Sequence, residues 1–568
     1  MTRTLFATRT VFVTTNSVQT QTTIDTGPYR YRWVALFVIL TVEVMDLLDA
    51  LVTTIAGPVI RAELGGSYSL IQWLGAAYTL AMAIGLLTGG RLGDIYGRRR
   101  MFLVGAAGFT LASLACALAP LPGFLVGARA VQGLFGALML PQGLGMMREM
   151  FGPEERAKAF GTFGPVMGLS SVGGPILAGW LVDADYFGSG WRMIFFINLP
   201  LGVFAVLGAI RYLPESRLER APRLDWLGVL FAAGGAFLLL FPLVQGRELD
   251  WPAWTFAMLA LGVVAFGLFA VYEGGRDRRG LDPLVTPSLF RKRAFTGGLA
   301  LGLMFFASLI GTGLVFTFYL QIGLGYSPLK AGLTTLPQAL GMVAGFVVAG
   351  AGLAERLGRR LLQAGTVVMI LGTVVFTGTV RLSGAGITPW HMAPALLVLG
   401  IGMGLAMAPF FGIVLAGVDD EESGSASGAI TSVQQLGGAF GIAVLGTVFF
   451  ALLPGAVGRH VDDSAGALRA TLATAGVPAD AHPAVVAGLR ECLTDRVAET
   501  NPDVTPPSCR DAGPAADPAL AAYAAEQVRA GFEDTTIRTT GVSLLLLLSA
   551  LGLTFLLPRR ARPDDAGH

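Results

Sequence analysis

Three carboxylic acids lie inside one long apolar stretch near the start of the sequence. Glu43, Asp46 and Asp49 are spaced three residues apart within residues 33–59, so on a helix they share one broad face. They are the only acids expected well inside a membrane span, where each charge would cost roughly 2.5–3.5 kcal/mol, or about 9 kcal/mol together. Burial and mutual repulsion both favour the protonated form of a carboxyl group, which suits groups that take up and release protons. Structural hydrogen bonding near a helix end is the alternative.

Arg129 is a basic residue inside a second apolar stretch, residues 122–147. At 1.5 Å per residue it lies roughly 10 Å from the start of its helix, while Asp46 lies about 20 Å along a helix of opposite direction. The two depths agree, so an ion pair of Arg129 with Asp46 or Asp49 is possible. Such a pair would either respond to protonation or serve as a static link between two helices.

The composition places most of the chain in a lipid bilayer. Hydrophobic residues make up 53% of the 568 residues and charged residues only 14%, too little charge to cover a soluble protein of this size. The net charge of +2 gives no reason to expect a nucleic-acid partner. None of the three lysines precedes Ser or Thr, which excludes a Walker-type phosphate loop, and the four histidines are scattered. We therefore expect no ATP hydrolysis, no metal, no cofactor and no enzymatic activity.

About fourteen apolar stretches are long enough to cross some 30 Å of hydrocarbon as helices. They lie near 33–59, 68–89, 101–119, 122–147, 160–182, 193–212, 226–244, 252–272, 296–320, 332–353, 361–380, 391–416, 427–452 and 540–557. Loops after the second, fourth, sixth, eighth and tenth stretches carry three to six basic residues, whereas the opposite loops carry one each. Because basic loops stay in the cytoplasm, we expect a multi-pass protein of the cell membrane with both termini cytoplasmic.

An internal repeat divides the chain into two halves. The segment Gly90-Arg-Leu-Gly-Asp94-Ile-Tyr-Gly97-Arg98-Arg99 returns as Ala351-Gly-Leu-Ala-Glu355-Arg-Leu-Gly358-Arg359-Arg360, and Ser171-Val-Gly-Gly174 returns as Gln435-Leu-Gly-Gly438. Position 94 corresponds to 355 and position 174 to 438, so the two copies are separated by nearly the same length of chain. Paired six-span halves around a site at mid-membrane are a common plan of secondary transporters.

The expected organisation follows from this repeat. It comprises a cytoplasmic tail at 1–32, a six-span half at 33–212, a linker with two inserted spans at 213–295, a second six-span half at 296–557 and a tail at 558–568. The first tail has no continuous apolar core and no small-residue cleavage site, so we do not expect a signal peptide there. The second half contains a long, Ala-rich, weakly helical loop at 453–539, expected on the outer side.

Two of the three cysteines lie in that long loop. Cys492 and Cys509 would face the oxidising side of the membrane, where a disulfide closing about 18 residues would contribute on the order of 3 kcal/mol. Two free thiols are the alternative. Cys116, inside an apolar stretch, is expected to be a small core residue.

The sequence resembles the fourteen-span drug/proton antiporter branch of the major facilitator superfamily. The matching segments are Leu48-Asp49-Ala-Leu-Val-Thr-Thr-Ile-Ala-Gly-Pro58, Gly90–Arg100, Arg129-Ala-Val-Gln132-Gly133, Gly168-Leu-Ser-Ser-Val-Gly-Gly174-Pro175-Ile-Leu-Ala-Gly179, Trp191-Arg192 through Asn198-Leu-Pro200, Tyr319-Leu-Gln321 and Ala331-Gly-Leu-Thr-Thr-Leu-Pro337. Ala178 stands where the branch usually has Gly, and Thr54 where it commonly has Asn.

The resemblance implies an all-helical membrane fold of two six-helix halves plus two inserted helices. It implies proton-coupled export of small amphipathic drugs or antibiotics by alternating access, with antibiotic resistance as the outcome and the proton gradient as the energy source. Export of one dedicated metabolite, lipid or siderophore is the alternative, followed by a uniporter or importer. Protons, substrate and lipid are the expected partners, and a monomer is the expected state.

The resemblance also assigns roles to residues. Arg129 would take part in proton coupling, together with the three acids. A conformational latch would comprise Gly90, Asp94, Gly97, Arg98 and Arg99 with Glu355, Gly358, Arg359 and Arg360. The antiporter motif, Gly168, Gly174, Pro175 and Gly179, would seal a leak path. Topology-setting charge and close helix packing are the respective alternatives.

Overall fold

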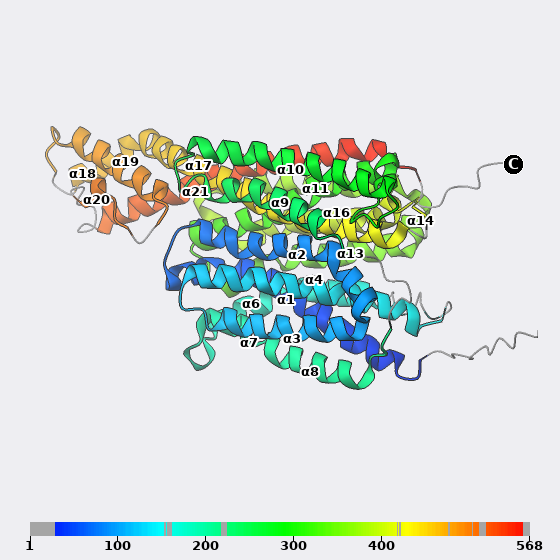
Figure 1. Ribbon diagram of the computed structural model, residues 1–568. Helices are drawn as coiled ribbons and strands as arrows, with labels where there is room; N and C mark the ends of the chain where they lie inside the picture. The colour runs from blue at the N-terminus through cyan, green and yellow to red at the C-terminus, as the bar shows by residue number, and fades with distance from the viewer. Residues whose placement is uncertain are drawn as a thin grey trace, which may run out of the picture.

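The computed structural model describes residues 29–559 except 153–154, 156–158, 160–161, 217–223, 417, 420–421, 475–476, 502–503 and 511–517. Within these residues the chain is helical and contains no strand. The long helices run roughly parallel to one another and form an elongated bundle (Figure 1). The expected tails, 1–32 and 558–568, lie largely outside the described residues.

The first half of the chain forms one group of helices. It comprises α1 (Arg32–Leu64), α2 (Ser69–Tyr96), α3 (Arg98–Ala117), α4 (Pro122–Met150), α6 (Phe163–Asp183), α7 (Met193–Phe196) and α8 (Asn198–Tyr212). Here α4 packs against α2 and α3, while α1 packs against α6 and α8. Small residues allow these contacts, since glycines let helix backbones approach closely. A Cβ at Gly105, for example, would lie 2.7 Å from Met139 Cβ.

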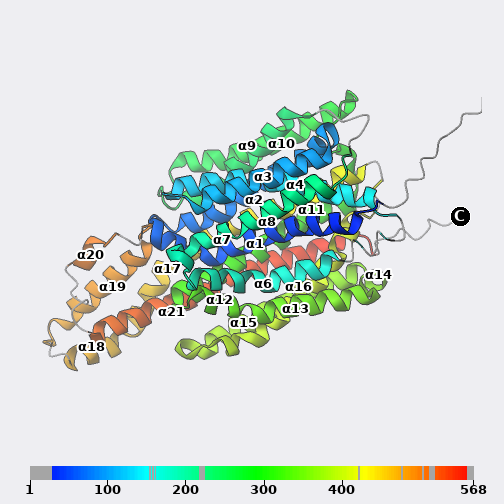
Figure 2. The same ribbon diagram turned by 90° about the horizontal axis from the view of Figure 1, so that it is seen from below.

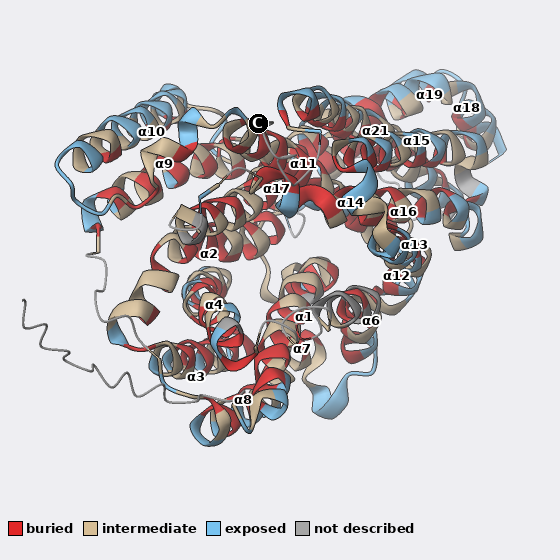
Figure 3. Ribbon diagram, turned by 90° about the vertical axis from the view of Figure 1, so that its right-hand side faces the viewer, coloured by how far each residue is buried: buried red, intermediate tan, exposed pale blue. Residues whose placement is uncertain are grey.

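The second half forms the other group. It comprises α11 (Arg293–Thr317), α12 (Pro328–Thr334), α13 (Leu336–Val348), α14 (Ala354–Leu357), α15 (Arg359–Ser383), α16 (Pro389–Val414), α17 (Ser423–Asp463) and α21 (Pro518–Leu553). The two groups occupy separate regions in the end-on view (Figure 3). They meet along two seams, one between α2 and α17 and the other between α6 and α12–α13.

Two inserted helices, α9 (Trp226–Gln245) and α10 (Ala253–Arg278), lie between the halves in sequence. They pack on each other along one edge of the bundle (Figure 2). Since α9 contacts both α2 and α17, the inserted pair covers the seam where those two helices meet. The short helix η3 (Pro287–Arg291) then leads into α11.

Twelve of the described helical segments are long and apolar enough to cross a membrane. Two further helices, α1 with 33 residues and α6 with 21 residues, are not among those twelve. The all-helical membrane fold expected from the sequence is therefore confirmed, while the count of fourteen spans stays a prediction.

A small helical domain projects from one end of the bundle. It contains α18 (Ala465–Thr474), α19 (His482–Ala498) and α20 (Pro507–Arg510), carried between the extended ends of α17 and α21. Leu468, Leu489 and Leu493 pack in one apolar core with Phe449 of α17. A disulfide joins Cys492 to Cys509. The segment expected as a weakly helical loop thus shares an apolar core with the bundle, and α21 begins at Pro518, well before the apolar stretch predicted at 540–557.

The two ends of the bundle differ. Helix α1 begins and α21 finishes at the same end, opposite the small domain (Figure 1). These are called the terminal end and the distal end below. The basic loops predict that the terminal end faces the cytoplasm, and that orientation stays a prediction.

Candidate functional site

The acids of α1 divide into two buried residues and one half-buried residue. Asp46 and Asp49 are 8% and 2% exposed, whereas Glu43 is only partly buried. A helix as apolar as α1 would be more stable in lipid without these groups. Their neighbours must therefore compensate them, and α4 supplies the main partner.

Asp49 forms an ion pair with Arg129 in the interior of the first half. The Arg129 Nη1 donates to Asp49 Oδ2, and both side chains are 1% exposed. Arg129 Nη1 also donates to Gln132 Oε1 at 2.7 Å, and Arg129 Nε donates to the Leu74 carbonyl at 3.2 Å. Of the two pairings left open by the sequence, the structure contains the one with Asp49. The geometry thereby compensates a charge that would otherwise be prohibitively costly.

Amide groups hold the other oxygen of Asp49. Gln132 Nε2 and Asn198 Nδ2 donate to Asp49 Oδ1 at 2.8 and 2.9 Å. The same two amides donate to Ser113 Oγ at 2.8 and 3.2 Å. Four helices, α1, α3, α4 and α8, thus contribute to one buried network. Such a buried network stabilises the fold most when each of its donors and acceptors has a hydrogen-bond partner.

Asp46 lies beside this network rather than within it. Its Oδ1 accepts a hydrogen bond from Tyr78 of α2. The guanidinium of Arg129 lies over the Tyr78 ring, with Cζ 4.2 Å from the ring centroid. Tyr78 therefore contacts both Asp46 and the cation that pairs with Asp49. Such cation–π contacts are stabilising when both groups are withdrawn from water.

Glu43 takes no part in these contacts. Within the described part of the chain, no hydrogen bond or ion pair involves its carboxyl group. The three acids share a face of α1, as expected, but the structure brings only Asp46 and Asp49 into contact with the arginine network. No metal-binding cluster of His, Cys, Asp and Glu occurs among the described residues either.

Several members of the network received no role from the sequence. Gln132 and Asn198 lie in the segments that resemble the family, whereas nothing in the spacing marks Ser113 of the network or Tyr78 beside it. A polar side chain in an apolar span was the available signal, because such groups need a hydrogen-bond partner when buried.

The first latch segment crosses the terminal end between α2 and α3. Gly97 separates the two helices with φ of 102°, a conformation that favours glycine. Arg98 pairs with Asp94 at 3.0 Å and with Glu149 of α4 at 2.8 Å. The Arg99 backbone N–H donates to Glu215 Oε1 at 3.2 Å, while Gly90 lies within α2 itself. This segment therefore links α2, α3 and α4.

The second latch segment also has a glycine of positive φ between two helices, but its contacts differ. Gly358 separates α14 from α15 with φ of 49°. Glu355 and Arg360 are exposed, and Arg359 Nη1 donates to the Leu557 carbonyl at 2.8 Å. In the described chain no ion pair joins Glu355 to Arg359. The internal repeat is thus preserved in the glycine turn, whereas the acid–base pairing of the first copy is absent from the second.

The antiporter motif lies on α6 at the seam between the halves. A Cβ at Gly179 would lie 2.5 Å from the Pro328 carbonyl oxygen, and a Cβ at Gly332 would lie 2.8 Å from the Pro175 carbonyl carbon. A Cβ at Gly168 would lie 3.1 Å from Val343 Cγ2. Glycines at these positions permit the close approach of helix α6 to α12 and α13.

Gly174 faces the other way. A Cβ there would lie 3.1 Å from Leu51 Cδ1 of α1. Since α1 carries the acids, α6 connects the proton-binding candidates on one side with the opposite half of the chain on the other.

Contacts between the halves gather at the distal end. Gln321 Nε2 donates to the Ile55 carbonyl at 2.7 Å, and the Leu329 N–H donates to Asp183 Oδ2 at 3.2 Å. On the other seam the rings of Tyr68 and Phe450 stack with centroids 4.5 Å apart. These contacts hold the two halves together on the side of the small domain.

Replacing Gly179 by Ala should weaken this distal closure. The new Cβ would meet backbone atoms of Pro328 and Leu329, which cannot rotate away. Overpacking of about 1–3 kcal/mol would move a two-state equilibrium by about 5- to 150-fold. Spin labels on Cys replacing the exposed Phe187 and Leu382, one on each half at the distal end, should report a longer distance.

Gly173→Ala is the matched control for that experiment. It lies on the same helix, but a Cβ there meets nothing within 4 Å. Equal distance distributions in both variants and in the parent chain would show that α6 does not control distal closure.

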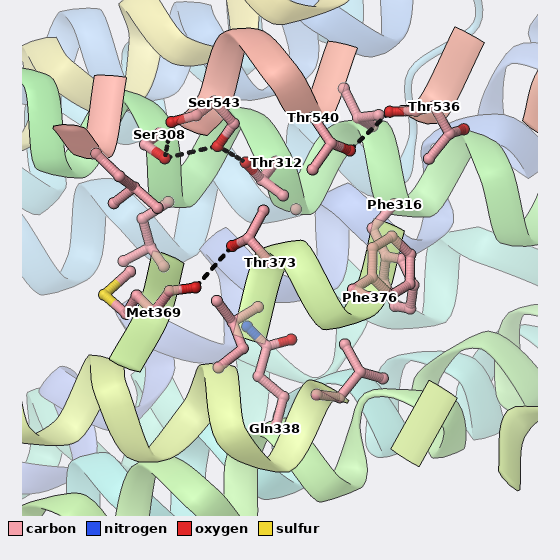
Figure 4. A pocket seen from close by; sticks show the side chains of 16 residues that line it. Ser308, Thr312, Phe316, Gln338, Met369, Thr373, Phe376, Thr536, Thr540 and Ser543 are labelled. Carbon is pink, nitrogen blue, oxygen red and sulfur yellow. Dashed lines mark hydrogen bonds between the residues drawn. The ribbon is translucent and has the colours of Figure 1, made fainter. Parts of the chain in front are cut away.

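A pocket lies inside the second half, between α11, α13, α15, α16 and α21 (Figure 4). The Ser543 hydroxyl lies 2.6 Å from the hydroxyls of both Ser308 and Thr312, and Phe316 and Phe376 pack together nearby. Its volume is about 50 Å³. That suffices for a few water molecules but not for a drug-sized ligand, which needs about 300 Å³ or more.

Comparison with known proteins identifies relatives over most of the chain. The chain is 46% identical to a probable actinorhodin transporter of Streptomyces coelicolor, over 95% of this chain and 94% of the relative. It is 37% identical to a puromycin resistance protein of Streptomyces alboniger, over 74% and 82% of the two chains. A tetracenomycin C resistance and export protein of Streptomyces glaucescens is 35% identical, over 73% and 76%.

The fold is also found among solved structures. A bacterial homologue of the human lysosomal transporter Spinster, in an inward-facing and occupied conformation, superposes with a TM-score of 0.58. It shares 16% sequence identity and covers 93% of this chain and 97% of its own. The family model of the major facilitator superfamily matches residues 38–442. The chain therefore belongs to the major facilitator superfamily and is a multi-pass membrane transporter.

Proposed function

We propose that this transporter exports small amphipathic antibiotics or drugs in exchange for protons, by alternating access. The observation that carries the proposal is the buried Asp49–Arg129 pair, a carboxylate and a guanidinium that are each 1% exposed on their side chains. Three relatives named above are a transporter, a resistance protein and an export protein for antibiotics. Their names support an antibiotic-like substrate, and the buried pair supports coupling to protons.

Protonation of Asp49 would be the coupling step. The carboxyl group then loses its charge, and its attraction to Arg129 weakens accordingly. Arg129 keeps its charge, because a guanidinium is not deprotonated in proteins. It would then rely more on the Tyr78 ring, which already lies 4.2 Å from its Cζ. A shift of α4 relative to α1 would follow, and α6 would transmit it to the second half.

The proton gradient is sufficient for such work. One proton that crosses a potential of about 100 mV releases roughly 2.3 kcal/mol, and one pH unit adds about 1.4 kcal/mol. One proton for each neutral substrate molecule could therefore sustain a concentration ratio of roughly 500-fold. This ratio is enough for resistance or self-protection.

In this proposal the terminal end faces the cytoplasm and the transporter works as a monomer. The distal contacts then close the outer side, and the first latch segment lies on the inner side. Protons would reach α1 from outside when the distal seams open. The Asp94–Arg98–Glu149 contacts would keep α2, α3 and α4 of the first half together on the inner side.

Export of a single dedicated metabolite is the second candidate. The probable actinorhodin transporter matches 95% of this chain, whereas the matches to the puromycin and tetracenomycin proteins cover 74% and 73%. A match of that extent includes the region of the small distal domain. The whole architecture is therefore shared with a relative that is named for one compound. A dedicated substrate of the same chemical kind would account for this.

Uptake into everted membrane vesicles tests the proposal. Puromycin should accumulate in vesicles that contain the transporter when their interior is acidified, and it should leak out when nigericin and valinomycin collapse both gradients. Vesicles from the same host without the transporter give the background. Accumulation that survives the ionophores would exclude proton antiport, and a panel of antibiotics in the same assay separates a broad from a dedicated substrate range.

A further inference from the structure

A cavity of about 430 Å³ lies between the inserted helix pair and the α2–α17 seam. Its volume is in the range of small-molecule sites. Its walls are apolar and come from α2, α9, α10, α11, η3 and α17; they include Leu87, Ala236, Phe266, Phe269, Val433 and Leu436. It is thus separate from the Asp49–Arg129 network and far larger than the pocket of Figure 4.

Two polar side chains in this lining have atoms without a partner. Glu273 of α10 and Ser432 of α17 are each 3% exposed. Glu273 Oε1 and Ser432 Oγ have no hydrogen-bond partner among the described residues. A buried polar atom left unpaired is costly, so such atoms in a cavity point to a ligand that completes them.

The other oxygen of Glu273 is fixed by the backbone. Glu273 Oε2 accepts hydrogen bonds from the N–H groups of Leu284 and Val285 at 2.6 and 3.4 Å. Arg91 of α2 binds the Pro283 carbonyl and lies 3.3 Å from the Leu284 carbonyl. The carboxyl group is therefore anchored through one oxygen, whereas no N–H or O–H group of the described residues donates to the other.

A second carboxylate converges on the same point. Asp225 caps α9 by accepting from the Gly228 N–H at 3.0 Å. A Cβ at Gly228 would lie 2.5 Å from Asp225 Oδ2 and 2.5 Å from Glu273 Oε1, so the two oxygens approach one position. Arg276 Nε lies 3.3 Å from Asp225 Oδ2. Two carboxylates that converge in this way require either a further cation or a shared proton.

The charges around this position do not balance. Asp225, Glu273 and Asp282 are acidic, whereas Arg276 and Arg91 are the basic groups that act on them. With every group ionised, one negative charge remains around Glu273, the member of this group that lines the apolar cavity. A cation with an apolar body fits this arrangement, whereas the phosphate of a phospholipid would be repelled by it.

The site lies at the depth of one leaflet. The rise of an α-helix places Glu273 about 8 Å before the end of α10 and Ser432 about 14 Å along α17, both measured from the terminal end. Beyond Ser432 on α17, Gln435 Nε2 lies 2.8 Å from Met82 Sδ of α2. The cavity thus adjoins a contact between the two halves.

We propose that the inserted helices form a lateral binding site for an amphipathic organic cation that enters from the bilayer. Its ammonium group binds Glu273, its apolar body fills the space between α10 and α17, and Ser432 supplies a further hydrogen bond. Loading of exported substrates through this site rests on the function proposed above, whereas binding itself does not.

Photolabelling of the full-length transporter tests the site without any gradient. The probe is 4-benzoylbenzyl-trimethylammonium, added to protein in phosphatidylcholine nanodiscs. Adducts should map to α10 or α17, and Glu273→Gln should raise the half-saturating concentration about tenfold or more, with a smaller rise for Ser432→Ala. The glutamine keeps an oxygen for the N–H groups of Leu284 and Val285, so the loop keeps its anchor.

Two further variants complete the design. Glu533→Gln removes a partly buried carboxylate of α21 and should label like the parent chain. Ala236→Phe fills the cavity with both carboxylates intact and should prevent labelling of these helices even if Glu273→Gln fails to fold.

Three results would overturn the proposal. Unchanged labelling of Glu273→Gln would show that the charge of Glu273 does not bind the probe. The two carboxyl groups would then be explained by a shared proton. Equal labelling by neutral 4-methylbenzophenone would show an unselective apolar cavity, and displacement of the cationic probe by added phosphatidic acid would identify a lipid as the occupant. Because no transport is measured, a failed vesicle assay and a failed labelling assay are distinguishable.

Discussion

Replacing Asp49 by Asn should abolish uphill export. The amide keeps the size and much of the hydrogen bonding of the carboxylate, but it cannot carry a proton. The substrate ratio that one proton can sustain, roughly 500-fold, should therefore fall to about one. Puromycin accumulation in everted vesicles, divided by the amount of folded transporter on size-exclusion chromatography, measures the change.

Asp250→Asn is the matched control for this variant. Asp250 is exposed in the turn between α9 and α10 at a φ of 56°, a conformation that asparagine also tolerates. It should accumulate substrate like the parent chain. Uphill accumulation by Asp49→Asn at the parent level would refute the coupling role of Asp49, whatever the fate of Glu43 and Asp46.

The fold was predictable because hydrophobicity and repetition reflect the membrane directly. Lipid allows only fully hydrogen-bonded backbone, so an apolar stretch of sufficient length indicates a helix. The repeated segment predicted that Gly97 and Gly358 occupy equivalent turns in the two halves. Both glycines have positive φ in the structure. Helix ends were less predictable. Helix α17 ends later and α21 begins earlier than the expected apolar stretches, because packing in the small domain stabilises both extensions.

The site was predictable only as far as depth along a helix determines it. The rise per residue brought Arg129 and the acids of α1 to one level, and the structure contains the Asp49–Arg129 pair. Rotation and tilt of the helices are set by side-chain packing, which spacing does not reveal. Ser113 and Tyr78 therefore gave no signal that they would meet Gln132 and Asp46.

Glu273 illustrates a different limit. The apolar stretch was predicted to end at residue 272, which assigned Glu273 to a basic loop. In the structure α10 continues to Arg278 and the Glu273 side chain is buried. A buried acid therefore occurs outside α1 as well, because hydropathy cannot recognise a charged helix turn that packs against neighbouring segments.

Changing both members of the buried pair should cost less stability than changing either one. Asp49→Asn leaves Arg129 with a charge it cannot lose, and Arg129→Gln leaves a carboxylate that can be neutralised only by a proton. Each single variant should lose about 3–5 kcal/mol of the free energy of unfolding, whereas Asp49→Asn with Arg129→Gln should come within about 1–2 kcal/mol of the parent chain. Reversible unfolding in mixed micelles measures these differences.

The same double variant decides between a coupling pair and a static strut. The two amides that it introduces can still bridge α1 and α4 by a hydrogen bond, so a strut would be restored along with stability. Proton coupling would not be restored, because neither amide can take up and release a proton. We therefore expect the double variant to fold well and to fail in uphill export, and recovery of both properties together would assign Asp49 and Arg129 a purely structural role.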